Sequence, residues 1–145
     1  MRNFIYILLI VLFLALPPVQ YVTELSNEPE QEELTAIKPT PKQFLKIEIA
    51  KQGLSQRDFE ILSAIIQAES QWRQFEFPGV VLKGKINDKD IGLCQINEFW
   101  HLSEAEKLGL DIYTVEGNLK FCVWLYKKEG TEPWNWSKDN WSKKI

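Results

Sequence analysis

The chain has 145 residues, a length that allows one ordinary domain with additional segments but not two sizeable domains. A hydrophobic share of 45% excludes a wholly disordered chain. The formal net charge of -3 lacks the basic excess of a dedicated nucleic-acid-binding protein, so we expect no nucleic-acid partner. Two cysteines and one histidine without ligand spacing do not form a zinc site, and no glycine-rich phosphate loop occurs. We therefore expect neither a metal nor a cofactor.

Residues 1–23 have the pattern of an export signal. Arg2 precedes an unbroken apolar run from Phe4 to Leu16, and no further charge occurs before residue 24. This pattern predicts a signal peptide or, because about 19 uncharged residues suffice to span a bilayer, an N-terminal membrane anchor. A buried core helix is the alternative. We predict an extracytoplasmic protein (secreted, periplasmic or in the cell wall) that contacts the membrane only through residues 4–22.

Residues 24–40 form an acidic segment with five glutamates, two prolines and almost no large apolar side chains. Such a segment cannot bury enough surface to offset its ordering entropy, so we predict a linker. Residues 41–145 then form one domain, which we expect to be monomeric. This domain has 15 basic and 15 acidic residues, so the net negative charge of the chain belongs to the linker.

The domain begins with two predicted helices. Thr40 and Pro41 have the residue types of an N-cap and a first helical position, and Gly53 is a stop signal. A second helix is expected to start at Ser55, with Asp58 three residues later, and to run to about Trp72.

The remaining pattern predicts a small sheet and two more helices. Turn residues and short β-branched runs between residues 78 and 96 predict a hairpin region. A short helix is expected over residues 103–108 and a longer one over residues 114–129, which Gly130 ends. The fold class expected is α+β, mainly α, with a small hairpin region beside the second helix.

Glu69 lies on the apolar stripe of the second helix. Leu62, Ile65 and Ile66 form that stripe, and Glu69 continues it at i+7, i+4 and i+3. Burial and the negative end of a helix both raise the pKa of a carboxyl group, which favours the protonated form that general-acid catalysis needs. The alternative is a glutamate at a fraying helix end that turns to solvent.

Three motifs in this order resemble the lysozyme-like lytic transglycosylases, the family of the soluble lytic transglycosylase catalytic domain. They are Glu69-Ser70, then Gly92-Leu93-Cys94-Gln95-Ile96-Asn97, then Asn118-Leu119 at the start of a later helix. The resemblance spans Ser55 to Tyr126. It implies a lysozyme-like domain, peptidoglycan glycan strands as the partner, and Glu69 as the sole acid/base. It also implies that the muramyl 6-hydroxyl closes on the anomeric carbon to give a 1,6-anhydro end.

A hydrolytic alternative uses Asp90 as a second carboxylate. The run from Asp90 to Asn97 also resembles C-type lysozymes, whose second catalytic aspartate stands just before the same glycine, and Trp100 falls where those enzymes place a sugar-stacking tryptophan. A retaining hydrolase needs its two carboxyl groups about 5 to 5.5 Å apart. The other interpretation of Asp90 is a turn residue that caps its own backbone.

Further candidates for substrate binding adjoin these carboxylates. Gln95 and Asn97 share one face of an expected strand with Leu93, so they can face the cleft or simply face solvent. Ser70 can hydrogen-bond near Glu69 or be an ordinary helix-end serine. We expect Gly92 to serve backbone geometry or close sugar approach.

The chain departs from the family after Gly130. The family's A-Y-N-x-G motif, whose tyrosine positions the glutamate, is missing, and neither Tyr113 nor Tyr126 can be assigned to that role from sequence. A non-catalytic wall-binding module is therefore a second alternative. Trp134 and Trp136 can line the cleft, although we favour a role in closing the core.

The single histidine and the two cysteines receive structural interpretations. We expect His101 to be a loop residue beside Trp100 rather than a catalyst. Cys94 and Cys122 both occur in apolar runs, so we interpret them as small buried side chains. A disulfide between them is the alternative in an exported chain.

Overall fold

The computed structural model describes residues 38–145. The predicted signal or anchor, and all but the end of the predicted linker, lie outside the described residues. Within residues 38–145, no helix is long and apolar enough to cross a membrane.

Capping boxes begin the first two helices. Helix α1 (Pro41–Lys51) has Thr40 as its N-cap, as predicted, and Gly53 follows its end at φ +69°. Helix α2 (Gln56–Glu69) begins at the predicted Ser55, whose side chain and that of Asp58 bond reciprocally to backbone N–H groups.

Helix α2 ends at Glu69, earlier than the predicted Trp72. Ser70 is its C-cap, and the next two residues, Gln71 and Trp72, have positive φ angles of 57° and 65°. Two consecutive residues with left-handed backbone conformation cannot continue a right-handed helix, and residues other than glycine rarely adopt this conformation. The early stop leaves Glu69 as the last helical residue.

Two small antiparallel sheets follow α2. Strands β1 (Phe75–Phe77) and β2 (Val80–Val81) pair around Pro78 and Gly79, and β3 (Asp90–Ile91) pairs with β4 (Ile96–Asn97). The hairpin region was therefore predicted correctly, although its strands are only two or three residues long.

Helix α3 (Glu98–Lys107) begins five residues before the predicted Ser103. The side chain of Asn97 accepts a hydrogen bond from the Trp100 backbone and so acts as the N-cap. His101 consequently lies on a helix and not in a loop, which corrects the sequence prediction. Helix α4 (Val115–Glu129) has the predicted bounds, with Thr114 as N-cap and Gly130 as C-cap.

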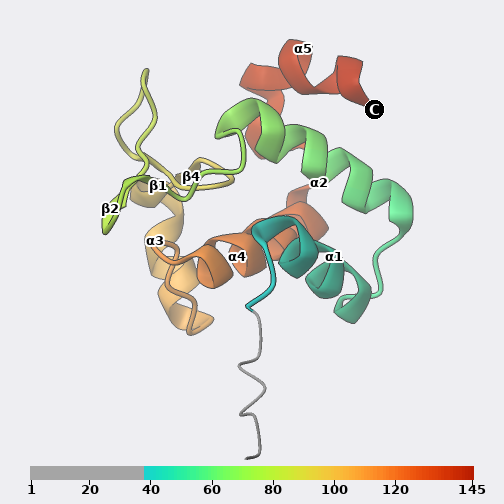
Figure 1. The fold of residues 1–145 in the computed structure, drawn as a ribbon, viewed down its shortest axis with the longest axis horizontal. Helices are drawn as coiled ribbons and strands as arrows, with labels where there is room; N and C mark the ends of the chain where they lie inside the picture. The colour runs from blue at the N-terminus through green and yellow to red at the C-terminus, as the bar shows by residue number, and fades with distance from the viewer. Residues whose placement is uncertain (1–37) are drawn as a thin grey trace, which may run out of the picture. The chain divides into compact units, whose positions relative to one another are not determined.

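A short helical tail ends the chain, where the sequence predicted no elements. It consists of the 3-10 helix η1 (Glu132–Ser137), helix α5 (Lys138–Trp141) and the 3-10 helix η2 (Ser142–Lys144). All three elements pack against α2. Figure 1 shows the red tail beside the green α2.

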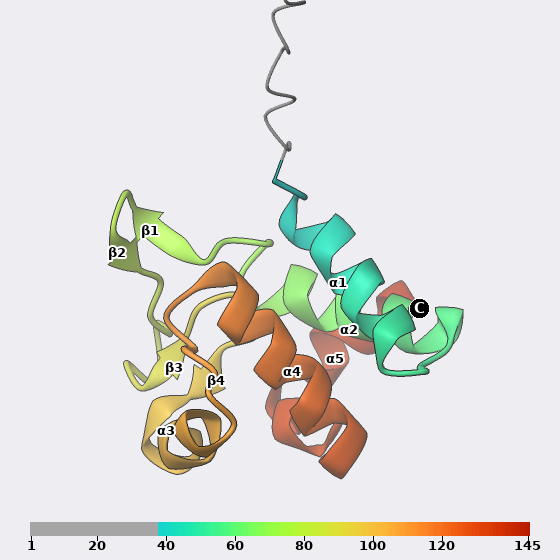
Figure 2. The same ribbon diagram turned by 90° about the horizontal axis from the view of Figure 1, so that it is seen from below.

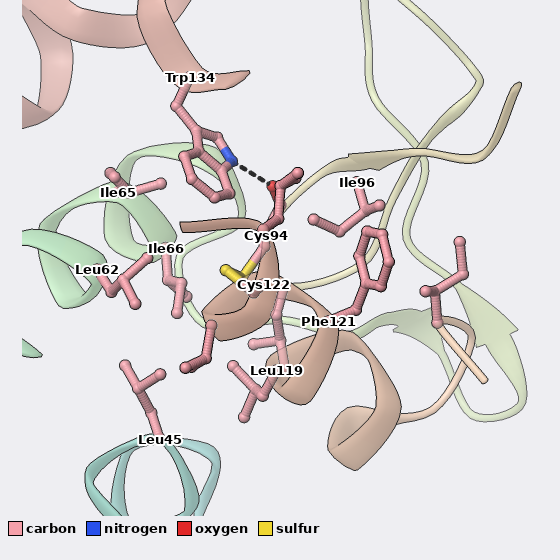
Figure 3. Close-up of a cluster of buried hydrophobic side chains, with 14 of the residues drawn as sticks. Leu45, Leu62, Ile65, Ile66, Cys94, Ile96, Leu119, Phe121, Cys122 and Trp134 are labelled. Carbon is pink, nitrogen blue, oxygen red and sulfur yellow. Dashed lines mark hydrogen bonds between the residues drawn. A yellow bond between two sulfur atoms is a disulfide. The ribbon is translucent and has the colours of Figure 1, made fainter. Parts of the chain in front are cut away.

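Helix α4 lies at the centre of the domain. In both views it runs between α1 and the side of the domain that holds the strands and α3 (Figures 1 and 2). The apolar stripe of α2 meets it in the core, where Leu62, Ile65 and Ile66 are wholly buried (Figure 3). The domain is thus α+β and mainly helical, with two small antiparallel sheets.

A disulfide joins Cys94, in the turn between β3 and β4, to Cys122 on α4. Both residues are wholly buried, as predicted, but the prediction of two unpaired side chains is wrong. The bond fastens the turn to the central helix at the middle of the core (Figure 3).

Candidate active site

A cleft of about 850 Å³ opens between α2, the strand region, α3 and the tail. Segments distant in sequence contribute its walls, from Ala68 at the end of α2 to Asn140 on α5. The predicted site residues that line it are Glu69, Ser70, Asp90, Gln95, Asn97 and Trp100.

Glu69 is half-buried at the end of α2, where the tail covers it. Burial raises the pKa of its carboxyl group above the ordinary value, a hydrogen bond from Ser137 lowers it, and the charge of Asp90 raises it. The net direction is upward, so Glu69 retains its proton to higher pH than an exposed glutamate. That protonation behaviour suits a general acid.

Asp90 lies in the same cleft at the start of β3. Its Oδ1 accepts hydrogen bonds from Asn97 Nδ2 at 2.7 Å and from Asn87 Nδ2 at 3.2 Å. Burial raises the pKa of Asp90, and the bond from Asn97 lowers it. The side chain that caps the turn is Asn87, which accepts from the Lys89 N–H, so the interpretation of Asp90 as a self-capping turn residue is wrong.

Two buried amides hold the turn between β3 and β4. Asn118 on α4 accepts from the Cys94 N–H at 3.0 Å and donates to the carbonyls of Ile91 and Ile112. Gln74 accepts from the Leu93 N–H at 3.0 Å and also donates to Ile112. Both amides thus bond to buried backbone groups in and around this turn.

Neither amide was predicted to have this structural role. Asn118 entered only through the family resemblance, although it is a polar residue between the buried residues of α4, a signal that the sequence of a helix can offer. Gln74 is 3% exposed but lies in a loop after α2, where the sequence shows no periodicity.

Gly92 is required by the geometry of this turn. Its φ is +70°, and a Cβ atom at this position would lie 2.3 Å from Gln74 Oε1. The prediction that Gly92 serves backbone geometry is confirmed. Close sugar approach is not tested by these contacts.

The expected strand from Leu93 to Asn97 is mostly a turn. Gln95 has a φ of +48°, and its Nε2 donates to the Gly92 carbonyl at 2.9 Å. Gln95 and Asn97 line the cleft as one interpretation held, but Leu93 is wholly buried in the core and does not share their face. The positive φ breaks the alternation on which that prediction depended.

The tryptophans divide between core and cleft. Trp134 and Trp141 are each 4% exposed, and their indole N–H groups donate to Cys94 O and Trp134 O, so both close the core, as was predicted for Trp134. Trp134 also contributes to the lining of the cleft. Trp136 is fully exposed and lines the cleft, which contradicts the core interpretation for this residue. Trp100 is 74% exposed and also lines the cleft, from the start of α3.

Ser70 and His101 have structural surroundings. Ser70 is buried, and its hydroxyl donates back to the Ile66 carbonyl at 3.2 Å, as an ordinary helix-end serine does. His101 is half-buried with its ring tilted on Phe121, and burial lowers its pKa. Its ring lines the cleft from α3.

Neither candidate tyrosine bonds to Glu69. The Tyr113 hydroxyl donates to Glu98 at 2.7 Å, and the Tyr126 hydroxyl donates to Asp58 at 2.8 Å. The bond to Glu98 together with burial raises the pKa of Tyr113 to about 12, and burial together with the bond to Asp58 raises the pKa of Tyr126 to about 12. Ser137, which the sequence did not single out, is the hydrogen-bond partner of Glu69.

The charged residues of the cleft do not form a metal site. Arg73, Lys83 and Lys85 line it as well as the carboxylates, and no cluster of three potential metal ligands occurs within residues 38–145.

Comparisons with models of protein families, with curated proteins and with solved structures find no match for this chain.

Proposed function

We propose that this chain is a lysozyme-like enzyme that cleaves the β-1,4 bond between N-acetylmuramic acid and N-acetylglucosamine in peptidoglycan. The reaction proposed is lytic transglycosylation, with Glu69 as the general acid and base. The observation that carries this proposal is Glu69 itself, a half-buried carboxyl group with a raised pKa at the wall of a cleft.

Protonated Glu69 donates its proton to the glycosidic oxygen, and the bond to the muramyl anomeric carbon breaks as positive charge develops on that sugar. The resulting carboxylate then accepts the proton of the muramyl 6-hydroxyl, whose oxygen bonds to the anomeric carbon. Glu69 is protonated again at the end, and no water is consumed. One carboxyl group is enough, because the N-acetyl group of the substrate can assist at the anomeric carbon.

The lining of the cleft supports a glycan as the ligand. Trp100 on α3 and Trp136 on η1 are exposed tryptophans of the lining, and indole rings can stack on the apolar faces of sugars. Gln95 and Asn97 add amide groups that can bond to hydroxyl and N-acetyl groups. Polar and charged residues outnumber apolar ones in the lining, which suits a ligand that carries many hydroxyl and amide groups.

Hydrolysis by Glu69 and Asp90 is the second candidate. It is favoured by the position of Asp90 in the same cleft, close enough for its charge to raise the pKa of Glu69. In that reaction Glu69 is the acid, and Asp90 is the second carboxylate that inverting and retaining glycosidases use. Hydrogen bonds from Asn97 and Asn87 orient the carboxylate of Asp90, which supports this role.

An extracytoplasmic location is part of the proposal. The buried disulfide supports it, because such bonds persist in oxidising compartments and are rare in the cytosol. The apolar segment of residues 4–22 would direct export or anchor the protein.

Digestion of purified peptidoglycan sacculi tests the proposal. We expect wild-type protein to release muropeptides with 1,6-anhydromuramic ends, as measured by mass spectrometry. Exclusively reducing muramic ends would instead establish the hydrolase. Glu69→Gln keeps the shape of the side chain but cannot donate a carboxylic proton, so we expect a loss of rate of about 10²- to 10⁴-fold with wall binding retained. Wild-type protein that pellets with walls but never cleaves them would overturn catalysis in favour of a binding module.

A further inference from the structure

The two carboxyl oxygens of Glu69 differ in their hydrogen bonds. The Ser137 hydroxyl donates to Glu69 Oε1, whereas Oε2 makes no hydrogen bond with any residue of the range 38–145. One oxygen is therefore held by the protein, and the other is left for an exchangeable proton.

The backbone around Ser137 fixes this hydroxyl in place. Ser137 lies between Trp134 and Trp141, both buried in the core. The Trp134 indole donates to Cys94 O at 2.8 Å, and the Trp141 indole donates to Trp134 O at 3.0 Å. The first bond joins the tail to the turn between β3 and β4, and the second joins two tail residues, so Ser137 lies between two residues that are held by buried contacts.

A second acceptor lies within reach of the same hydroxyl. Ser137 Oγ is 3.1 Å from Trp134 O, but one hydroxyl proton serves one acceptor fully. Trp134 O already accepts from the Trp141 indole, so it does not need the serine proton. The hydroxyl proton is consequently available to Glu69.

We propose that Ser137 is the positioning residue of Glu69. The Ser137 hydroxyl donates to Oε1 in both protonation states of Glu69, which makes Oε2 the oxygen that exchanges the catalytic proton. When Glu69 is ionised, Oε1 accepts as a carboxylate oxygen. When Glu69 is protonated on Oε2, Oε1 accepts as a carbonyl oxygen. In the proposed reaction Oε2 therefore gives its proton to the glycosidic oxygen and later receives one from the 6-hydroxyl. This role takes the place of the missing family tyrosine, and it rests on the proposed function.

A substitution of Ser137 changes none of the charged residues around Glu69. Asp90 faces it from β3, and the tail residues that line the cleft have no charge. The remaining charged or titratable residues of the lining are Arg73, Lys83, Lys85, His101 and Glu129. None of them is altered when the serine hydroxyl is removed, so a change in the pKa of Glu69 would report the lost hydrogen bond.

The experiment is a carboxyl titration of Glu69 by carbon NMR in the full-length chain, with Glu69→Gln used to assign the signal. The hydrogen bond from Ser137 favours the ionised form, so we expect the pKa of Glu69 to rise further in Ser137→Ala and to stay near the wild-type value in Ser137→Thr. Ser142→Ala is the matched control, because it removes a hydroxyl from the same tail without touching Glu69. A pKa of Glu69 in folded Ser137→Ala equal to that of the wild type overturns the proposal.

A second variant and a second readout complete the test. Should Ser137→Ala fail to fold, Ser137→Cys replaces the hydroxyl by a weak donor, and an unchanged pKa of Glu69 there is equally decisive against the proposal. In glycan cleavage, we expect Ser137→Ala to lose about tenfold in turnover, the value of one ordinary hydrogen bond. The alkaline limb of its pH profile should move to higher pH, whereas a merely structural defect lowers the rate without moving that limb. The titration needs no activity, so failure of the proposed function and failure of the positioning role are distinguishable.

Discussion

Removal of the Cys94–Cys122 disulfide is expected to cost a large part of the stability of the domain. The two cysteines are 28 residues apart, and loop-closure entropy for a loop of that length corresponds to about 3.6 kcal/mol at 25 °C. For the 108 residues from 38 to 145, an unfolding entropy of about 2.1 cal/mol/K per residue converts this loss into a fall in Tm of roughly 15 °C. Truncation of two wholly buried side chains adds to the loss.

The measurement is chemical unfolding of wild-type protein and Cys94→Ala/Cys122→Ala, followed by tryptophan fluorescence. All six tryptophans lie after residue 70, so the signal reports the domain. A thiol assay on denatured, unreduced wild-type protein is the control, and we expect no reactive thiol. Two reactive thiols, or a loss of unfolding free energy below about 1 kcal/mol, would refute the reasoning, because typical disulfides contribute about 2 to 4 kcal/mol.

Two other substitutions test the energetic reasoning about the cleft. Because the fold raises the pKa of Glu69 above its unfolded value of 4.5, the wild type loses stability as pH rises from that value through the raised pKa. Glu69→Gln should therefore have a higher Tm than the wild type at neutral pH. The difference in Tm should vanish well below pH 4.5, where Glu69 is protonated in both the folded and the unfolded wild type. A difference in Tm that persists in acid would contradict this. Asn118→Ala removes the side-chain partner of the buried Cys94 N–H and of the Ile91 carbonyl, whereas the Ile112 carbonyl keeps its bond from Gln74. We therefore expect the free energy of unfolding to fall by about 2 to 6 kcal/mol in urea titrations. A loss under about 1 kcal/mol would show that water or rearrangement replaces those bonds.

Local capping chemistry made the helix starts predictable. Thr40, Ser55 and Thr114 each accept a backbone hydrogen bond at the start of a helix, and this interaction depends only on residues three positions apart. Asn97 acts in the same way for α3, but the sequence pattern indicated only a strand there, whereas in the structure Asn97 is both the last residue of β4 and the N-cap of α3. Where two local interpretations compete for one residue, only the three-dimensional packing decides between them.

Helical periodicity made the position of Glu69 predictable. The stripe of Leu62, Ile65 and Ile66 is wholly buried, and Glu69 continues it as a half-buried side chain in the cleft. Ser137 was not predictable in this way, because it meets Glu69 across 68 residues through a tail without a regular apolar pattern. A contact of one hydroxyl with one carboxylate leaves no periodic signal in either segment.

Trp134 is a tail residue that belongs both to the core and to the lining of the cleft. Its indole donates to Cys94 O, beside the disulfide, and its carbonyl lies 3.1 Å from the hydroxyl of Ser137, which bonds to Glu69. A displacement of Trp134 therefore moves the turn that includes Gln95 and the hydroxyl that holds the carboxyl group at the same time. These contacts form one continuous series from the core to Glu69. The position of the Glu69 carboxyl group therefore depends on the same packing that stabilises the fold.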